Sequence, residues 1–279
     1  MILSLLTDYG HEDEFVGVCH AIIRGIAPEV PVVDLTHGIP RYGVRHGAIV
    51  LRNSLPYLPP GVHVAIVDPQ VGTERRGIAV RTGDRRILVG PDNGLLSLAW
   101  EVAGGVVEAV DVSRSPHRLE PVSATFHGRD VFAPVAARLA AGAELAEAGQ
   151  HVDPDELEVL ELPRAEVREG EVRAHVLIVD RFGNASLDAG HDELAGSGLA
   201  LGKRVEIEVH AKGGGSGGGP PAAGERFIAT FAQTFADVQF GEVILYEDGY
   251  RSLAIAVNRG DAAGALKLSP DTTVILRPR

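Results

Sequence analysis

The first 142 residues alternate short runs of β-branched and aliphatic residues with stretches in which apolar residues recur every three or four positions. The apolar runs have the length of strands, and the three-to-four spacing puts apolar side chains on one face of a helix. Strands are expected at 2–6, 30–35, 62–67, 77–81, 86–89 and 106–112, and helices near 15–26, 44–55, 94–100 and 131–139. This repeated alternation predicts a layered α/β domain with a mostly parallel sheet.

The pattern changes beyond about residue 143. Acids and prolines become frequent, as in a linker, and the later apolar runs are short, strand-like and separated by turn residues. These runs cover 172–179, 204–209, 227–230, 243–246, 253–257 and 273–276. Six short strands with almost no helix predict a small antiparallel sandwich or barrel. We therefore predict an α/β domain at 1–155, a linker at 156–169 and an all-β, barrel-like domain at 170–279.

Net charge and cysteine content narrow the classes of function. The formal net charge of −12 disfavours binding to a phosphate backbone and mildly favours a cationic ligand. No apolar run has the length of a membrane span, and the first residues lack the basic start of a signal peptide. Cys19 is the only cysteine and lies on a predicted apolar helix face, so we expect it to be buried and the protein to be cytoplasmic.

Several familiar motifs are missing from the sequence. There is no G-x-G-x-x-G after the first strand, no Walker lysine motif, no H-E-x-x-H, no cysteine pair and no G-x-S-x-G elbow. The glycine run at 213–219 has no following helix or Lys-Ser/Thr pair, so we interpret it as a surface loop. The eleven histidines compose no obvious metal site, and His37, after the second predicted strand, fits a plain loop residue.

Charged residues gather directly after the predicted strand at 62–67. That strand ends on Asp68, and the following loop carries Arg75 and Arg76. In open α/β sheets, ligands bind at the carboxyl ends of the strands, and loops there often carry function. His127 precedes a predicted helix, where a lone histidine is usually structural. Together with Asp68 and Arg75, however, it would complete a set of acid, base and cation.

Other polar residues allow two interpretations. Asp8, after the first strand, could be a cap or turn residue for the next helix or accept hydrogen bonds from two ribose hydroxyls, and the sequence favours neither. Asp13 fits an acid in the first turn of a helix, and Asn93 fits a turn. The segment 180–184, Asp-Arg-Phe-Gly-Asn, fits a hairpin turn, or a site that stacks on and hydrogen-bonds a heterocycle.

Six short motifs occur in order along nearly the whole chain. They are Leu-Thr-Asp-Tyr-Gly at 6–10, Val-Asp-Pro-Gln-Val-Gly-Thr at 67–73, Gly-Pro-Asp-Asn-Gly at 90–94, Phe-His-Gly-Arg-Asp at 126–130, Asp-Arg-Phe-Gly-Asn at 180–184 and Ala-Ile-Ala-Val-Asn at 254–258. Each motif is weak alone, but six in order are specific. Together they resemble the adenosine-forming S-adenosyl-L-methionine (SAM) hydrolases, also called the SAM hydroxide adenosyltransferase family. That family is related to the SAM-dependent fluorinase and chlorinase.

The resemblance implies an N-terminal α/β domain, a C-terminal barrel-like domain and a homotrimer. The substrate would lie between the N-terminal domain of one subunit and the C-terminal domain of its neighbour. Water or hydroxide would attack C5′ of the ribose of SAM and give adenosine and L-methionine. SAM is then the substrate, and neither a cofactor nor a metal is expected.

The resemblance also assigns roles to residues. It places the catalytic acid, cation and histidine on Asp68, Arg75 and His127, and the ribose-binding acid on Asp8. It places contacts to adenosine or methionine on Asp180, Phe182 and Asn184. The remaining candidate substrate contacts are Asp13, Asn93, Tyr246 and Asn258.

There are two alternatives to hydrolysis. Halide transfer is a reaction of the same superfamily, and binding of SAM or adenosine without turnover is a different class of function. The halogenases carry tyrosine where this chain has Asp68, and the fluorinase has serine where it has Gly128, although the chlorinase also has glycine there. Asp68 and His127 therefore favour hydrolysis over halide transfer. A protein that binds SAM or adenosine without turnover is disfavoured because all three catalytic residues are present.

The expected chemistry needs few groups. Neutral methionine leaves a sulfonium without a metal or a strong acid, so catalysis reduces to placing one water in line with C5′ and sulfur in a dry pocket. A carboxylate that is paired with arginine and faces a sulfonium is a poor general base. We therefore expect Asp68 to orient the water, and His127 to orient Asp68 or the water or to pass on the proton.

Overall fold

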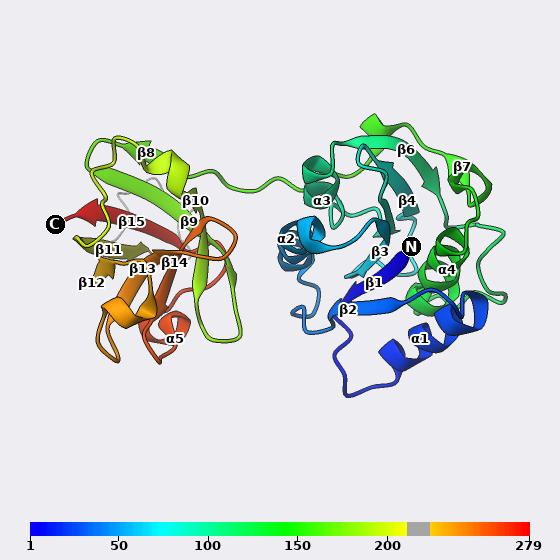
Figure 1. The fold of residues 1–279 in the computed structure, drawn as a ribbon, viewed down its shortest axis with the longest axis horizontal. Helices are drawn as coiled ribbons and strands as arrows, with labels where there is room; N and C mark the ends of the chain where they lie inside the picture. The colour runs from blue at the N-terminus through cyan, green and yellow to red at the C-terminus, as the bar shows by residue number, and fades with distance from the viewer. Residues whose placement is uncertain (211–223) are drawn as a thin grey trace. The chain divides into compact units, whose positions relative to one another are not determined.

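The computed structural model describes residues 1–210 and 224–279, and the chain divides into two units, Met1–Leu160 and Glu161–Arg279 (Figure 1). The division falls inside the segment 156–169, which we expect to be a linker. The predicted surface loop at 213–219 lies outside the described residues.

A seven-stranded sheet runs through the first unit in the order β2-β1-β3-β5-β4-β6-β7. Its strands are β1 (Ile2–Thr7), β2 (Val32–Thr36), β3 (Gly61–Ile66), β4 (Gly77–Thr82), β5 (Ile87–Pro91), β6 (Val106–Asp111) and β7 (Gln150–His151). The neighbours β2, β1, β3 and β5 pair in parallel. Strand β4 is antiparallel to both β5 and β6, so β6 runs in the same direction as β5. The predicted mostly parallel sheet is confirmed.

Helices cover both faces of this sheet (Figure 1). They are α1 (Phe15–Ile26), α2 (Val44–Ser54), α3 (Ser97–Val102), α4 (Ala133–Ala140), a π-helical turn (Gly128–Phe132) and the 3₁₀ turns Leu55–Tyr57, Leu145–Glu147 and Pro154–Glu156. One face of β1 and β3 packs against α1 and α4. On the other face, α2 comes so close at Gly47 that a Cβ there would meet Leu95 and Val67. Cys19 is buried, as expected, and burial raises the pKa of its thiol to about 12.

The described residues of the second unit form a closed barrel of seven strands, and an eighth strand, β8, pairs with its outside. Its strands are β8 (Glu166–Arg168), β9 (Glu171–Val179), β10 (Ala185–Gly190), β11 (Arg204–His210), β12 (Glu225–Phe231), β13 (Val243–Glu247), β14 (Ser252–Val257) and β15 (Thr273–Pro278). The strands of the barrel follow the order β10-β14-β13-β12-β11-β15-β9, and the barrel is closed because β9 also pairs with β10. Strand β8 pairs with β9 outside the closed ring. The short helix α5 (Ala262–Leu266) and the 3₁₀ turns His191–Leu194 and Phe235–Asp237 complete this unit. The predicted barrel-like domain is confirmed.

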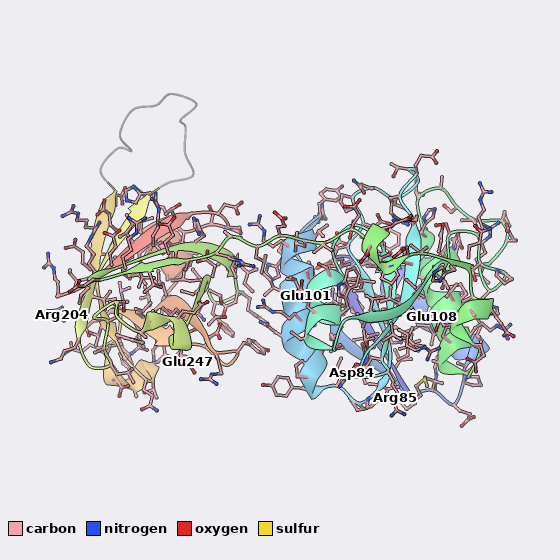
Figure 2. All side chains as sticks on the ribbon, turned by 90° about the horizontal axis from the view of Figure 1, so that it is seen from above. Asp84, Arg85, Glu101, Glu108, Arg204 and Glu247 are labelled. Atoms are coloured by element: carbon pink, nitrogen blue, oxygen red, sulfur yellow. The ribbon has the colours of Figure 1, made fainter. Side chains whose placement is uncertain are left out.

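Charged side chains lie on the outside of both units. Figure 2 shows Asp84 and Arg85 projecting from the turn that joins β4 to β5, and Glu101 on α3.

No helix in the described ranges combines the length and the apolar character needed to cross a membrane.

Candidate active site

Two carboxylates lie at the carboxyl ends of neighbouring parallel strands. Thr7 of β1 is in register with Ile66 of β3, so Asp8 and Asp68 follow the two strands at the same edge of the sheet. Burial raises the pKa of Asp8, and the nearby charge of Asp68 acts in the same direction, against a hydrogen bond that Asp8 accepts from the main-chain N of Tyr42 at 3.0 Å. The helix-cap interpretation of Asp8 is wrong, because α1 begins at Phe15 with Glu14 as its cap.

Arg75 forms a two-pronged ion pair with Asp68. Its Nε donates to Asp68 Oδ1 at 2.9 Å, and its Nη2 donates to Asp68 Oδ2. Only 5% of the Arg75 side chain and 6% of the Asp68 side chain are exposed. The guanidinium also lies over the ring of Phe132, with its central carbon 5.2 Å from the ring centre. A buried, bidentate pair of this kind holds the carboxylate in one orientation.

The same guanidinium reaches His127. Arg75 Nη2 lies 3.0 Å from His127 Nδ1. A guanidinium can only donate, so Nδ1 accepts, and the neutral imidazole must carry its proton on Nε2. Burial, followed by the charge of Arg75, lowers the pKa of His127, so the neutral form prevails at neutral pH. His127 therefore presents a hydrogen-bond donor at Nε2. It stands just before the π-helical turn Gly128–Phe132, a feature common at functional sites.

The neighbouring arginine serves a different carboxylate. Arg76 Nε donates to Asp92 Oδ2 at 3.0 Å, and its Nη2 donates to the main-chain oxygen of Glu156 at 2.6 Å. Arg76 thus connects the loop to Glu156, near the end of the first unit, and pairs with Asp92, whereas Arg75 pairs with Asp68.

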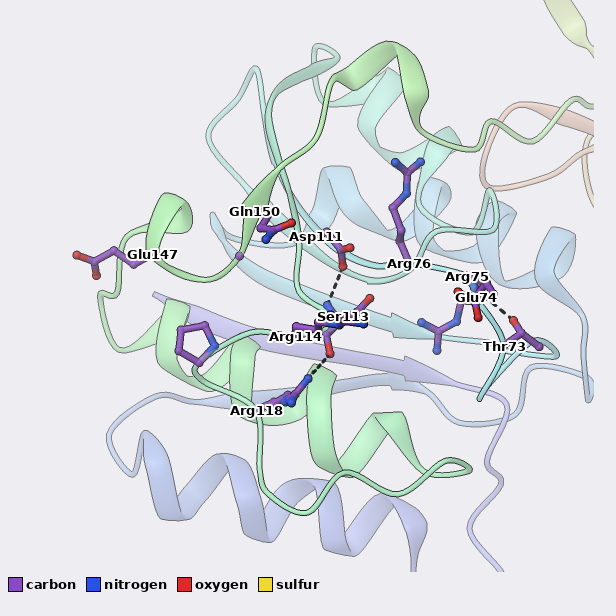
Figure 3. A pocket seen from close by; sticks show the side chains of 12 residues that line it. Thr73, Glu74, Arg75, Arg76, Asp111, Ser113, Arg114, Arg118, Glu147 and Gln150 are labelled. Carbon is purple, nitrogen blue, oxygen red and sulfur yellow. Dashed lines mark hydrogen bonds between the residues drawn. The ribbon is translucent and has the colours of Figure 1, made fainter.

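A polar cavity of about 580 Å³ lies beside this loop (Figure 3). Its lining includes Arg75, Arg76, Arg114 and Arg118, but neither Asp68 nor His127. The cavity therefore shares only Arg75 with the group formed by Asp68, Arg75 and His127.

The positions of Asn93 and Asp13 can each be explained by the local backbone structure, without a substrate contact. The Nδ2 of Asn93 donates to the main-chain oxygen of Val67 at 2.9 Å, and its Oδ1 accepts from the main-chain N of Leu95 at 3.1 Å. Asn93 therefore fixes the backbone just before Asp68. Asp13 is exposed in the turn before α1, so the first-turn interpretation is wrong. Substrate contacts by both residues stay predictions.

The segment 180–184 is a hairpin turn between β9 and β10, which confirms one of its two interpretations. Asp180 Oδ1 accepts from the main-chain N of Phe182 at 2.8 Å and of Asn184 at 2.9 Å, and Asn184 Nδ2 donates to Asp180 Oδ2 at 2.8 Å. The carboxylate of Asp180 thereby holds the turn, while Phe182 is 69% exposed at its tip. An exposed phenylalanine on a rigid turn is a suitable stacking surface.

A cavity of about 460 Å³ in the barrel adjoins this turn; we call it the barrel cavity. It is lined by Phe182, Asn184, Phe235, Val257, Asn258, Arg259, Gly260 and Asp261. Asn258 is buried, and its Nδ2 donates to the main-chain oxygens of Phe235 and Val238, both at 2.9 Å, so it shapes the cavity wall. Tyr246 is not among the lining residues but packs on Phe235, with ring centres 5.1 Å apart. Burial raises the pKa of Tyr246 to about 12.

The sequence matches one known family over most of its length. Residues 3–149 match the SAM hydroxide adenosyltransferase N-terminal domain, and residues 174–275 match the C-terminal domain. The chain belongs to the SAM hydroxide adenosyltransferase family.

The similarity of this SAM hydroxide adenosyltransferase family member to known proteins covers nearly the whole chain. An (R)-S-adenosyl-L-methionine hydrolase from Salinispora tropica is 44% identical over 269 residues, covering 96% of this chain and 94% of the relative. A fluorinase from Actinopolyspora mzabensis is more distant, with 27% identity over 302 residues, 98% of this chain and 96% of the fluorinase. An uncharacterized conserved protein from Thermotoga maritima has the same fold, with a TM-score of 0.87, 33% identity and coverage of 99% and 100% of the two chains.

Gly128 of this family member lies directly against a tyrosine ring. A Cβ at Gly128 would collide with the hydroxyl of Tyr9. Tyr9 packs between Phe15 and Phe126, with ring centres 5.7 and 6.0 Å away, and burial raises its pKa well above the usual range. The phenol therefore stays protonated and fills the space that a serine side chain at 128 would need.

The structure also brings together groups that the sequence analysis missed in this family member. Phe235 and Arg259 line the barrel cavity, and only the nearness of Arg259 to the motif at 254–258 pointed to it. His20, Asp34 and His37 have potential metal-ligand atoms within 4.8 Å of one another, although we expected no metal site. They come from α1, β2 and the loop after β2, so no short motif records them.

Proposed function

We propose that this protein hydrolyses SAM to adenosine and L-methionine by attack of water or hydroxide at C5′ of the ribose. The observation that carries the proposal is the contact of one guanidinium with both Asp68 and His127 at the sheet edge that also bears Asp8. Membership in a family with a relative named as a SAM hydrolase supports the choice of substrate.

The proposed reaction is a single displacement. An oxygen–C5′ bond forms as the C5′–sulfur bond breaks, and the electron pair of the broken bond stays on sulfur. The sulfonium becomes the neutral thioether of methionine, and the water loses one proton to solvent. Because the leaving group is neutral, no cofactor is required in this proposal.

We assign the three residues separate roles. Asp68 accepts a hydrogen bond from the attacking water, and His127 donates one to its oxygen from Nε2. Arg75 holds both partners in place, and Asp68 receives the proton as the oxygen–carbon bond forms and then releases it to solvent. Placing the water in line with the bond that breaks supplies ~7–11 kcal/mol when the geometry is good.

We assign the remaining contacts by chemistry. Asp8 accepts hydrogen bonds from the ribose hydroxyls, while Phe182 stacks on the adenine and Asn184 hydrogen-bonds to it. Asp180 acts through the turn that presents these two residues. In the relative's name, "L" already specifies the α-carbon, so "(R)" specifies the sulfonium. We propose that this chain prefers the same configuration at sulfur.

We also propose that the active site is shared between subunits of a homotrimer. The Asp68 group of one subunit would face the barrel cavity of its neighbour. The family resemblance supports this arrangement, as does the exposed Phe182 at the rim of the cavity. We further propose a cytoplasmic location, in keeping with a single, buried cysteine.

Incubation of the purified protein with SAM, followed by chromatography, tests the reaction. We expect adenosine and methionine in equal amounts, with faster consumption of the form that is R at sulfur. Formation of 5′-chloro-5′-deoxyadenosine when chloride is added would identify a halide transferase instead. SAM that stays bound and unconverted would identify a binding protein.

A further inference from the structure

Three side chains outside the proposed active site converge on one point at the edge of the first unit. His20 Nε2 of α1 lies 2.9 Å from Asp34 Oδ1 and 3.1 Å from Asp34 Oδ2, and His37 Nε2 lies 3.1 Å from Asp34 Oδ1. Two imidazole nitrogens and one carboxylate are a donor set that binds zinc and related ions. In a tetrahedral zinc site, donor atoms lie about 3.3 Å apart, close to these separations.

The second observation concerns the buried nitrogen of His37. The side chain of His37 is 1% exposed, and its Nε2 lies 3.1 Å from Asp34 Oδ1 without the alignment of a regular hydrogen bond. A buried imidazole nitrogen that faces a carboxylate needs either a proton or a metal ion between the two atoms. The side chains of His20 and Asp34 are 31% and 39% exposed, so an ion can reach this point from solvent.

The other nitrogen of His37 has a partner that suits metal binding. Its Nδ1 lies 2.8 Å from the hydroxyl oxygen of Thr7, and that oxygen also accepts from the main-chain N of Tyr9 at 3.1 Å. When Nδ1–H donates to Thr7, Nε2 carries a lone pair. Metal-bound histidines commonly use their second nitrogen in this way.

We propose that His20, Asp34 and His37 form a binding site for a divalent transition-metal ion of the zinc class, with at least one position left to water. The ion would join α1 to β2 and to the loop after it. His37 also connects through Thr7 to the end of β1, where Asp8 stands. The site is therefore structural: it stiffens the sheet edge that presents Asp8 and takes no part in the displacement. The proposal is independent of the activity of the protein.

Cobalt(II) titration of untagged protein that has been stripped with a chelator tests this proposal. We expect one Co²⁺ per chain, a visible ligand-field absorption that Zn²⁺ removes, and a higher melting temperature with either ion. His20→Ala and Asp34→Asn should each lose the absorption and the thermal shift. Both positions are partly exposed, so these variants should fold. Thr7→Val, which removes the partner of His37, should weaken metal binding about 10–100-fold.

His151→Ala is the matched control, because His151 is an exposed histidine on β7 away from the cluster. It should bind Co²⁺ as the unmodified protein does. Absence of saturable binding to the unmodified protein would overturn the proposal. So would a His20→Ala variant that binds Co²⁺ with unchanged affinity, since the ion would then lie elsewhere.

Discussion

At the scale of single residues, Arg75 organises the candidate active site. A guanidinium has only donors, so each partner of Arg75 must accept. That requirement makes both oxygens of Asp68 acceptors and gives His127 a lone pair at Nδ1. The contacts of Arg75 therefore determine which groups can form hydrogen bonds to a water: the remaining lone pairs of Asp68 and the Nε2–H of His127.

The variant Asp68→Asn tests the charge of the carboxylate. Asparagine keeps the shape but cannot neutralise Arg75 or accept from both of its donors, so we expect kcat to fall by about 10²–10⁴-fold with a smaller change in KM. The measurement is the initial rate of adenosine formation. Glu101→Gln, on the exposed side of α3, is the control and should change nothing. Turnover near the unmodified rate would refute a role for the charge of Asp68.

The lowered pKa of His127 predicts the pH dependence of turnover. Protonation would put a hydrogen on Nδ1, where it would face the Arg75 donor, so the active form is the neutral one. We expect kcat to be constant at higher pH and to fall on acidification, with a midpoint below the usual histidine value of about 6.5. His127→Gln should be slow but lack this acid limb. A profile that stays flat from about pH 5 to 9 would exclude titration of His127.

At the scale of elements, strands β1 and β3 position both carboxylates and bury a polar pair between them. Ser4 and His63 are opposite each other in the parallel register, and Ser4 Oγ lies 2.9 Å from His63 Nδ1. Both side chains are fully buried, and burial lowers the pKa of His63 to about 4. The unfolded chain therefore binds a proton on His63 at pH values where the folded strand cannot.

This difference predicts how the stability of the first unit depends on pH. The contribution of His63 is complete above about pH 6.5 and is lost progressively as the pH falls toward 4, by about 3 kcal/mol in total. Urea unfolding followed by the fluorescence of Trp100, the only tryptophan and a residue of α3, measures it. His63→Gln should show a shallower decline of stability with acid. An equal decline in both proteins would contradict the assignment.

The elements also show where sequence patterns succeed. Strands β1 and β3 and helices α1, α2 and α4 follow the predicted positions, because each buries a regular apolar face. Strand β10, Ala-Ser-Leu-Asp-Ala-Gly, was not predicted. It has no β-branched residues and forms because it pairs with both β9 and β14, which closes the barrel.

At the scale of the whole molecule, the two units carry different parts of the proposed site. The first unit bears Asp68, Arg75 and His127, and the second bears Phe182 and the barrel cavity. If neighbouring subunits of a trimer combine these parts, a trimer that contains two different inactive variants can regain activity.

Co-expression of Asp68→Asn with Phe182→Ala tests this arrangement. When the two variants are made in equal amounts and assemble at random, about a quarter of all sites should have both parts intact, and activity should return to that level. The two proteins mixed without exchange of subunits are the control and should stay inactive. Light scattering should report a trimer. A stable monomer, or no recovery in trimers shown to be mixed, would rule out a shared site.

The sequence alone determined the α/β and barrel classes, the order of the six motifs and the candidate residues Asp68, Arg75 and His127, because periodicity and short motifs are local properties of the chain. The tertiary structure confirmed that Arg75, which the resemblance had selected over Arg76, pairs with Asp68, and it decided that Nδ1 of His127 accepts from Arg75. It also brought His20, Asp34 and His37 together. Such contacts depend on distances between residues that only folding brings close, and a linear pattern contains no such distances.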